Sequence, residues 1–156
     1  MVKKNVPKLI ISLIIPQLAG IIGSLFTMSS ISSWYAPLAK PELTPPNWVF
    51  GPVWITLYFL MGISLYIVWS GKNLSSRMPL IVFGIQMVLN AIWSIVFFGL
   101  ESPIFGLVVI VTLWCAIALT IWTFWKVSKL AAYVLLPYIA WVSIATYLNY
   151  GILTLN

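Results

Sequence analysis

The chain has 156 residues, of which 62% are hydrophobic and only 6% are charged, and its mean hydropathy is +1.08. Soluble domains carry about a quarter charged residues, so this composition excludes a soluble globular protein and indicates one membrane domain over residues 1–156. The net charge of +6 falls in the predicted loops, where it indicates topology rather than a nucleic-acid surface. Because the chain has no His and a single cysteine, Cys115, it predicts no metal site and no internal disulfide.

Five apolar segments are long enough to cross a membrane as α-helices. Each holds about 21 to 23 residues, and at a rise of about 1.5 Å per residue such a helix covers the hydrocarbon core of about 30 Å. We therefore predict an all-α membrane protein, a bundle of five transmembrane helices. The helices are expected at residues 9–29, 49–69, 79–100, 104–125 and 131–153.

Small residues and prolines predict how the helices pack and bend. Small residues recur in the first helix at positions 19, 20, 23, 24 and 27, and they let helix backbones approach closely in lipid. Two interpretations stay open, a contact inside the bundle or a seam between two copies, for which Gly84 and Ala91 are a second candidate. Pro16 and Pro137 each remove a helical hydrogen bond, so a kink is expected at both.

The segment between the first two helices, residues 30–47, is expected to act as a lid. It contains Trp34 and Tyr35, followed by prolines at positions 37, 41, 45 and 46. A connection this long and this rich in proline is more often functional than passive. It lies at the membrane surface nearest to the aromatic side chains described next.

The third predicted helix carries a polar and aromatic stripe. Gln86, Asn90, Trp93 and Phe97 are spaced four, three and four residues apart, which places them on one face of the helix. An amide buried in hydrocarbon needs a partner, so this face turns toward protein or toward a cavity. Asn90 therefore either bonds to a neighbouring helix or lines a ligand pocket, and the spacing leaves both interpretations open.

Two further aromatic stripes favour a pocket. Trp54, Trp93 and Trp141 lie about 8, 11 and 18 Å from the lid surface at the rise of a helix, which together with the lid predicts a concave, mostly apolar site. The two stripes are Phe50, Trp54, Tyr58 and Met61 in the second helix, and Tyr138, Trp141, Ala145 and Asn149 in the fifth. The tryptophans expected to anchor helix ends at the membrane surfaces are Trp48, Trp69 and Trp125.

No Asp, Glu, Lys, Arg or His falls within the five predicted helices. Charged groups inside a membrane normally mark ion and proton pathways, so their absence excludes an ion or proton carrier. It also leaves no general base and no activated nucleophile for conventional catalysis. A transporter is less favoured, because five helices cannot divide into two equal inverted repeats.

The basic residues are distributed unequally between the two sides of the predicted bundle. Seven fall on the side of the N-terminus, and only Lys40 falls on the other side, where Glu42 offsets it. Cytoplasmic loops concentrate Lys and Arg, so we expect the N-terminus in the cytoplasm and the C-terminus outside. The seven residues are Lys3, Lys4, Lys8, Lys72, Arg77, Lys126 and Lys129.

Short motifs follow one another in several of the predicted helices and in the first loop. They are Trp34–Tyr35, Lys40–Pro41, Pro45–Pro46, Pro52–Val53–Trp54, Gln86, Leu89–Asn90, Trp93–Ser94, Phe97–Phe98, Pro137–Tyr138, Trp141, Ala145 and Leu148–Asn149. Each motif is weak alone, but their order, together with five helices and the chain length, is highly specific. The chain resembles the tryptophan-rich sensory protein/translocator protein family, also called the peripheral-type benzodiazepine receptor.

The resemblance implies a membrane receptor, usually a homodimer, whose pocket at the first-loop end binds porphyrins such as protoporphyrin IX and other flat hydrophobic ligands. It also implies light- and oxygen-dependent porphyrin degradation, with Trp54 and Trp141 as the photochemical, catalytic residues. Porphyrin would then be ligand or substrate, so no cofactor is expected. The expected ligand-binding residues are Tyr35, Pro45, Trp54, Tyr58, Asn90, Trp93, Phe97, Cys115, Tyr138, Trp141 and Ala145.

The chain departs from the animal members of that family in one respect. Those members bind cholesterol through a C-terminal tyrosine followed by a basic residue, whereas no basic residue follows Tyr147 or Tyr150 here. This difference favours a multi-pass protein of a bacterial cell membrane. The predicted function is a porphyrin receptor with photo-oxidative activity, and the alternatives are a transporter or a non-catalytic sensor of lipophilic small molecules.

The charge asymmetry generates a labelling prediction. In a Cys115→Ser background, Lys40→Cys should react in intact cells with a membrane-impermeant thiol reagent, because the positive-inside rule places that loop outside. Lys72→Cys should react only after the membrane is permeabilised. The reverse pattern of labelling would show that the orientation is inverted.

Overall fold

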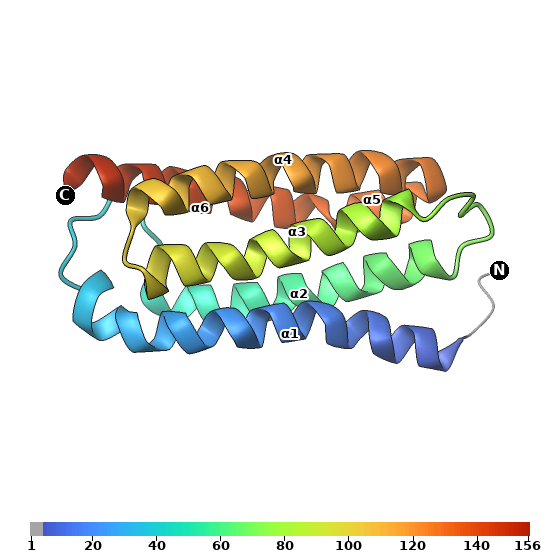
Figure 1. The fold of residues 1–156 in the computed structure, drawn as a ribbon, viewed down its shortest axis with the longest axis horizontal. Coiled ribbons are helices and arrows are strands. Elements are labelled where there is room, and N and C mark those ends of the chain that lie inside the picture. The colour runs from blue at the N-terminus through green and yellow to red at the C-terminus, as the bar shows by residue number, and fades with distance from the viewer. Residues whose placement is uncertain (1–4) are drawn as a thin grey trace.

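The computed structural model describes residues 5–156, so Lys3 and Lys4, which enter the topology prediction, lie outside the described residues. Five helical rods lie side by side along the long axis of the molecule (Figure 1). The elements are α1 (Val6–Ser30), η1 (Ile31–Tyr35), α2 (Asn47–Trp69), α3 (Met78–Ser94), η2 (Ile95–Gly99), α4 (Pro103–Val127), α5 (Lys129–Val134) and α6 (Leu136–Leu155).

Within residues 5–156 the rods form five segments long and apolar enough to cross a membrane. The prediction of an all-α bundle with five membrane-crossing helices is therefore confirmed. The segments are Val6–Tyr35, Asn47–Trp69, Met78–Gly99, Pro103–Val127 and Lys129–Leu155.

The first helix is longer than predicted. It continues from α1 through the π-helical turn η1 to Tyr35, so the predicted loop 30–47 shortens to residues 36–46, which we call the lid. In this segment the Ser33 hydroxyl donates to the carbonyl of Ser29 at 3.2 Å, one helical turn back, whereas the Ser30 hydroxyl donates across to the carbonyl of Phe98 at 2.7 Å. The helix stops only at Ala36, directly before Pro37.

The two prolines expected to kink their helices behave differently. The fifth helix is interrupted at Leu135, between α5 and α6 and two residues before Pro137, as predicted. Pro16 instead lies inside a continuous α1, where its missing N–H leaves the carbonyl of Ser12 without its helical partner. That carbonyl faces Gly62 of α2, where an added Cβ would lie 2.8 Å from its oxygen.

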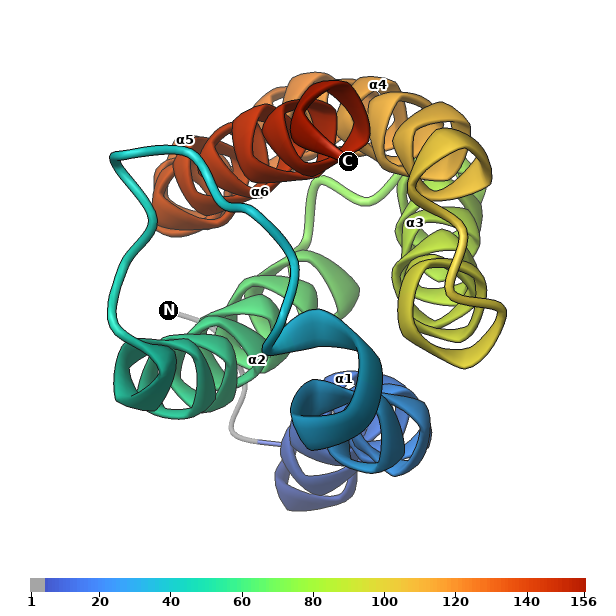
Figure 2. The same cartoon turned by 90° about the vertical axis from the view of Figure 1, so that its left-hand side faces the viewer.

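The helices pack around a common hydrophobic core. α1 packs against α2 and α3, α4 packs against α3 and α6, and α2 contacts α5 more than α6. Viewed from the end that carries the C-terminus, α1 and α2 lie opposite α4 and α6, and the lid crosses between them (Figure 2). Of the small residues in α1, Gly20 faces the Tyr58 ring and Gly23 faces Ser94, so both serve contacts inside the bundle.

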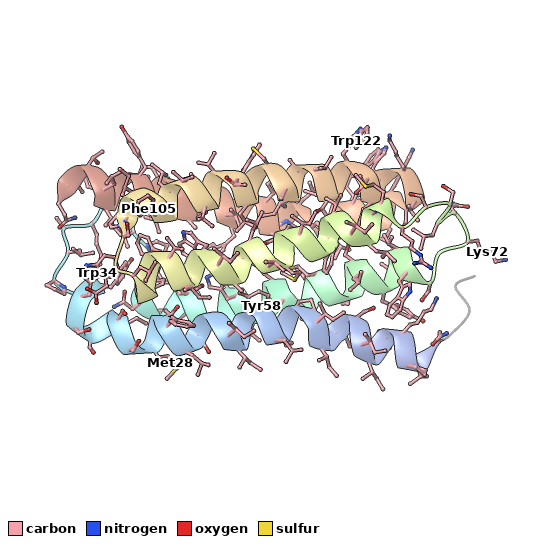
Figure 3. All side chains as sticks on the ribbon, in the orientation of Figure 1. Met28, Trp34, Tyr58, Lys72, Phe105 and Trp122 are labelled. Carbon is pink, nitrogen blue, oxygen red and sulfur yellow. The ribbon has the colours of Figure 1, made fainter. Side chains whose placement is uncertain are left out.

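The ends of the bundle differ in charge. Trp34 lies at the end with the lid and the C-terminus, and Lys72 lies at the opposite end (Figure 3). At that opposite end Lys8 of α1 donates from Nζ to the carbonyl of Trp69, 3.1 Å away, and caps the end of α2. We call these two ends the lid end and the basic end.

The close approach of α1 and α2 generates a stability prediction. Gly62→Ala places a methyl group against the backbone of Ser12 and Leu13, at 2.8 and 2.9 Å, and backbone cannot rotate away. Overpacking of this kind should cost about 1–3 kcal/mol of unfolding free energy. Gly51→Ala on the same helix is the matched control, because nothing lies within 4 Å of its Cβ position. Thermal unfolding in detergent should separate the two variants, and equal melting temperatures would show that the α1–α2 contact is looser than described.

Candidate ligand-binding cavity

A cavity of about 580 Å³ lies at the lid end of the bundle, enclosed by α1, η1, α2, α3, η2 and α6. This volume falls in the range of about 300–1,000 Å³ that is typical of small-molecule sites. α2 and α6 make few contacts with each other. Side chains of both helices and the cavity therefore occupy the space between α2 and α6.

Aromatic rings form the wall of the cavity on the α2 and α3 side. The ring of Trp54 stacks on Tyr58 with centroids 5.5 Å apart, and it lies 6.5 Å from the ring of Trp93. Trp93 in turn stacks on Phe97 at 5.4 Å and an interplanar angle of 18°. These rings come from two helices and present flat, polarisable surfaces to a ligand.

Trp141 on α6 forms part of the opposite wall. Its ring meets Phe50 of α2 edge to face at 5.7 Å. Its indole Nε1 is buried and has no hydrogen-bond partner. The sequence stripes in the second and fifth helices therefore converge on the cavity, because α2 and α6 face each other across it.

Asn90 lies beneath the cavity and connects three helices. Its Oδ1 accepts a hydrogen bond of 2.8 Å from the Tyr58 hydroxyl of α2, and its Nδ2 donates at 3.0 Å to the Tyr138 hydroxyl of α6. Tyr138 donates onward to Oε1 of Gln86 at 3.0 Å. Of the two interpretations left open by the sequence, the structure shows the bond between helices, and Asn90 is not among the cavity-lining residues.

The structure brings seven of the eleven predicted ligand-binding residues to the cavity surface. These seven are Tyr35, Trp54, Tyr58, Trp93, Phe97, Trp141 and Ala145. Asn90 and Tyr138 are buried directly behind the aromatic wall, with the Tyr138 ring 6.4 Å from Trp54. Pro45 is half-buried in the lid and does not line the cavity.

Cys115 lies away from the cavity. It is exposed on the outer surface of α4 and does not line the cavity. Leu113 and Ile117, two positions before and after it, are fully buried. Residues two positions apart on a helix point in roughly opposite directions, so the burial of those two neighbours turns Cys115 outward.

α1 supplies a wall of the cavity that the sequence reading assigned only to packing. Gly20, Gly23, Ser24 and Thr27 line the cavity, together with Gln17. The small residues at four-residue spacing in the sequence predicted that α1 packs closely, but the spacing alone does not show whether it packs on another helix, a second copy or a cavity. Trp48, expected to anchor a helix end, lies at the mouth of the cavity and is 74% exposed.

The lid is held to the end of α6 (Figure 2). The Asn156 side chain accepts a hydrogen bond from the backbone N–H of Ala39 at 3.0 Å and donates to the Ala39 carbonyl at 3.1 Å. The ring of Pro41 packs against Gly151, where a side chain would collide with it. The lid therefore has a fixed position over the lid end.

The cavity lining contains no charged side chain. The basic residue of the lid, Lys40, lies over the ring of Tyr35 with its Nζ 4.7 Å from the ring centroid. Among residues 5–156, no three His, Cys, Asp or Glu side chains lie together in a way that suits a metal ion. The site is suited to a ligand with large apolar faces.

The fold and the cavity define a multi-pass membrane protein with an aromatic-lined binding site at one end of a five-helix bundle. The chain belongs to the TspO/MBR family, whose model matches residues 12–155. The family predicted from the sequence motifs is thus confirmed.

Relatives of the chain come from archaea, bacteria and animals. It is 45% identical over 152 residues to the tryptophan-rich protein TspO of Archaeoglobus fulgidus, covering 97% of this chain and 99% of that one. It is 41% identical over 138 residues to the human translocator protein, covering 86% and 82%. The tryptophan-rich sensory protein of Cereibacter sphaeroides is 35% identical over 123 residues, covering 79% and 77%. A bacterial origin therefore stays a prediction.

The position of Asn90 generates a prediction about stability and affinity. Asn90→Leu leaves the buried hydroxyl of Tyr58 without its acceptor, which should cost about 1–3 kcal/mol of unfolding free energy. The affinity for protoporphyrin IX should hold, because Asn90 does not line the cavity. Thr112→Val is the control, since its hydroxyl bonds only within its own helix, to Val108. Lost affinity with unchanged thermal stability would make Asn90 a ligand contact.

Proposed function

We propose that the protein binds porphyrins such as protoporphyrin IX, and other flat hydrophobic molecules, in the cavity at the lid end. The observation that carries the proposal is the row of rings formed by Trp54, Trp93 and Phe97, with centroid separations of 6.5 and 5.4 Å. A large planar macrocycle gains from each such face by stacking and by burial of apolar area. The neutral lining favours the same ligand class, because it offers no countercharge to a compact ionic ligand.

The bilayer is the proposed source of the ligand. Three residues that line the cavity also face outward between α1 and α2, namely Ile21, Met28 and Ile55, which are 57%, 75% and 64% exposed. Apolar side chains on the outside of a membrane bundle contact lipid. A hydrophobic ligand dissolved in the bilayer reaches the cavity along this side without passing the lid.

Light- and oxygen-dependent degradation of the bound porphyrin is the second part of the proposal. Trp54 and Trp141 are readily oxidised indoles in the cavity wall. On illumination, an excited porphyrin takes one electron from an indole and becomes a radical anion, and molecular oxygen then attacks the reduced ring. Protein-based acid or base chemistry is not required, which agrees with the uncharged lining.

The protein is further proposed to lie in a bacterial cell membrane as a homodimer, with the basic end in the cytoplasm and the cavity toward the outside. Among residues 5–156, Lys8, Lys72, Arg77, Lys126 and Lys129 are the basic residues of the predicted cytoplasmic side. Gly84 and its surroundings on α3 are the candidate dimer seam, because open space surrounds the glycine.

Substitution of the cavity tryptophans separates binding from chemistry. The double variant Trp54→Phe/Trp141→Phe keeps flat apolar walls but removes two readily oxidised indoles. Binding of protoporphyrin IX in the dark should weaken by about 1 kcal/mol or less, in the range of one aromatic contact, while the light-dependent loss of porphyrin should fall sharply. Absorbance and product masses should be followed in the dark and under illumination.

A Trp114→Phe variant serves as the control, because that indole lies on the outer surface of α4, bonded to Ser143. If the double variant degrades porphyrin as fast as the wild type, the photochemical role is wrong. The protein would then be a non-catalytic sensor or a transporter of lipophilic molecules.

A further inference from the structure

The two tryptophans proposed to react have different neighbours. Trp141 pairs with Phe50, a ring that is not readily oxidised. Trp54 instead has three oxidisable rings around it, Tyr58 at 5.5 Å, Tyr138 at 6.4 Å and Trp93 at 6.5 Å between centroids. A positive charge formed on Trp54 therefore has nearby electron donors, whereas the described neighbour of Trp141 offers none.

The two tyrosines are poor electron donors in this setting. A phenol releases its hydroxyl proton when it is oxidised, so oxidation needs a base at the end of the O–H bond. The Tyr58 hydroxyl donates to the amide oxygen of Asn90, and the Tyr138 hydroxyl donates to the amide oxygen of Gln86. Amide oxygens are very weak bases, so both hydrogen bonds hold the tyrosines in their protonated form.

Trp93 is suited to hold the positive charge. An indole can lose one electron and keep its N–H proton, and the Trp93 Nε1 donates to Oδ1 of Asn149 at 3.2 Å. Asn149 is fixed in this orientation because its Nδ2 donates to the carbonyl of Pro103 at 2.7 Å. A hydrogen bond from a charged donor is stronger than one from a neutral donor, particularly in a buried, apolar site.

The contrast with Trp141 strengthens this assignment. The Nε1 of Trp141 is buried without a partner, so a positive charge on that ring gains no such hydrogen bond. The ring of Trp93 also stacks on Phe97 and is 9% exposed, which keeps water away from it. The hydrogen-bonding environment thus distinguishes Trp93 from Trp141.

We propose that Trp93 is a relay that returns an electron to Trp54 after the light-driven step, with Asn149 as the positioning residue of the relay. This inference rests on the proposed photochemistry. The excited porphyrin takes one electron from Trp54, and Trp93 then gives one electron to the Trp54 radical cation. The charges at this point are a porphyrin radical anion and a Trp93 radical cation. Molecular oxygen consumes the porphyrin radical anion, and the relay slows the return of the electron because the hydrogen bond to Asn149 stabilises the positive charge on Trp93.

Flash photolysis of the protoporphyrin IX complex tests the relay. The wild type should show a tryptophan radical cation by transient absorption and electron paramagnetic resonance. Trp93→Phe should shorten the lifetime of that radical and lower the porphyrin loss per absorbed photon. Asn149→Leu keeps Trp93 but removes the acceptor of its N–H. It should raise the ratio of radical cation on Trp54 to radical cation on Trp93 by about tenfold, equivalent to about 1.4 kcal/mol of lost hydrogen bonding.

Matched variants distinguish the relay from its alternatives. Trp114→Phe removes an indole whose N–H is also hydrogen-bonded, but on the outer surface, and it should leave the radical lifetime unchanged. Unchanged lifetimes in both Trp93→Phe and Asn149→Leu, with porphyrin still bound, would overturn the relay. A radical of wild-type yield in Trp54→Phe would also overturn it, because Trp93 would then donate directly. Absence of any tryptophan radical in the wild type would instead remove the photochemical proposal, and the relay with it.

Discussion

A single buried amide, Asn90, joins α2, α3 and α6 in a region where the membrane supplies no water to replace its hydrogen bonds. Its two bonds, to Tyr58 and Tyr138, are 2.8 and 3.0 Å long, and the Tyr138 hydroxyl extends the network by donating to Gln86 at 3.0 Å. In hydrocarbon an unpaired amide costs several kcal/mol, so these bonds define how the three helices meet. The aromatic wall of the cavity is built directly above this junction.

Small residues of α1 and α2 determine where these two helices touch and where they leave room for a side chain. Gly62 lets α2 touch the backbone of α1 beside Pro16, whereas nearer the lid Gly20 makes room for the ring of Tyr58. α1 and α2 therefore touch backbone to backbone at Gly62, and nearer the lid they line part of the cavity. The lid then closes that end through Asn156 and Pro41.

The five helices could be predicted because hydropathy and length alone mark membrane spans, and the aromatic stripes could be predicted because helical spacing shows which residues share a face. Other features depend on contacts that a single sequence does not display. The side of α4 that faces the core decides the position of Cys115, and the first helix continues to Tyr35, beyond its predicted end at residue 29. Spacing likewise placed Asn90 on the correct face, but only its partners show that it connects helices.

The most direct test of the central claim is a structure of the protein with protoporphyrin IX, prepared and measured in the dark. We expect the macrocycle inside the cavity at the lid end, in van der Waals contact with Trp54 and Trp93, with Trp141 on the opposite side and Asn90 out of contact. A macrocycle bound on the outer surface of α4, or in no fixed position between the helices, would contradict the assignment of this cavity as the ligand site.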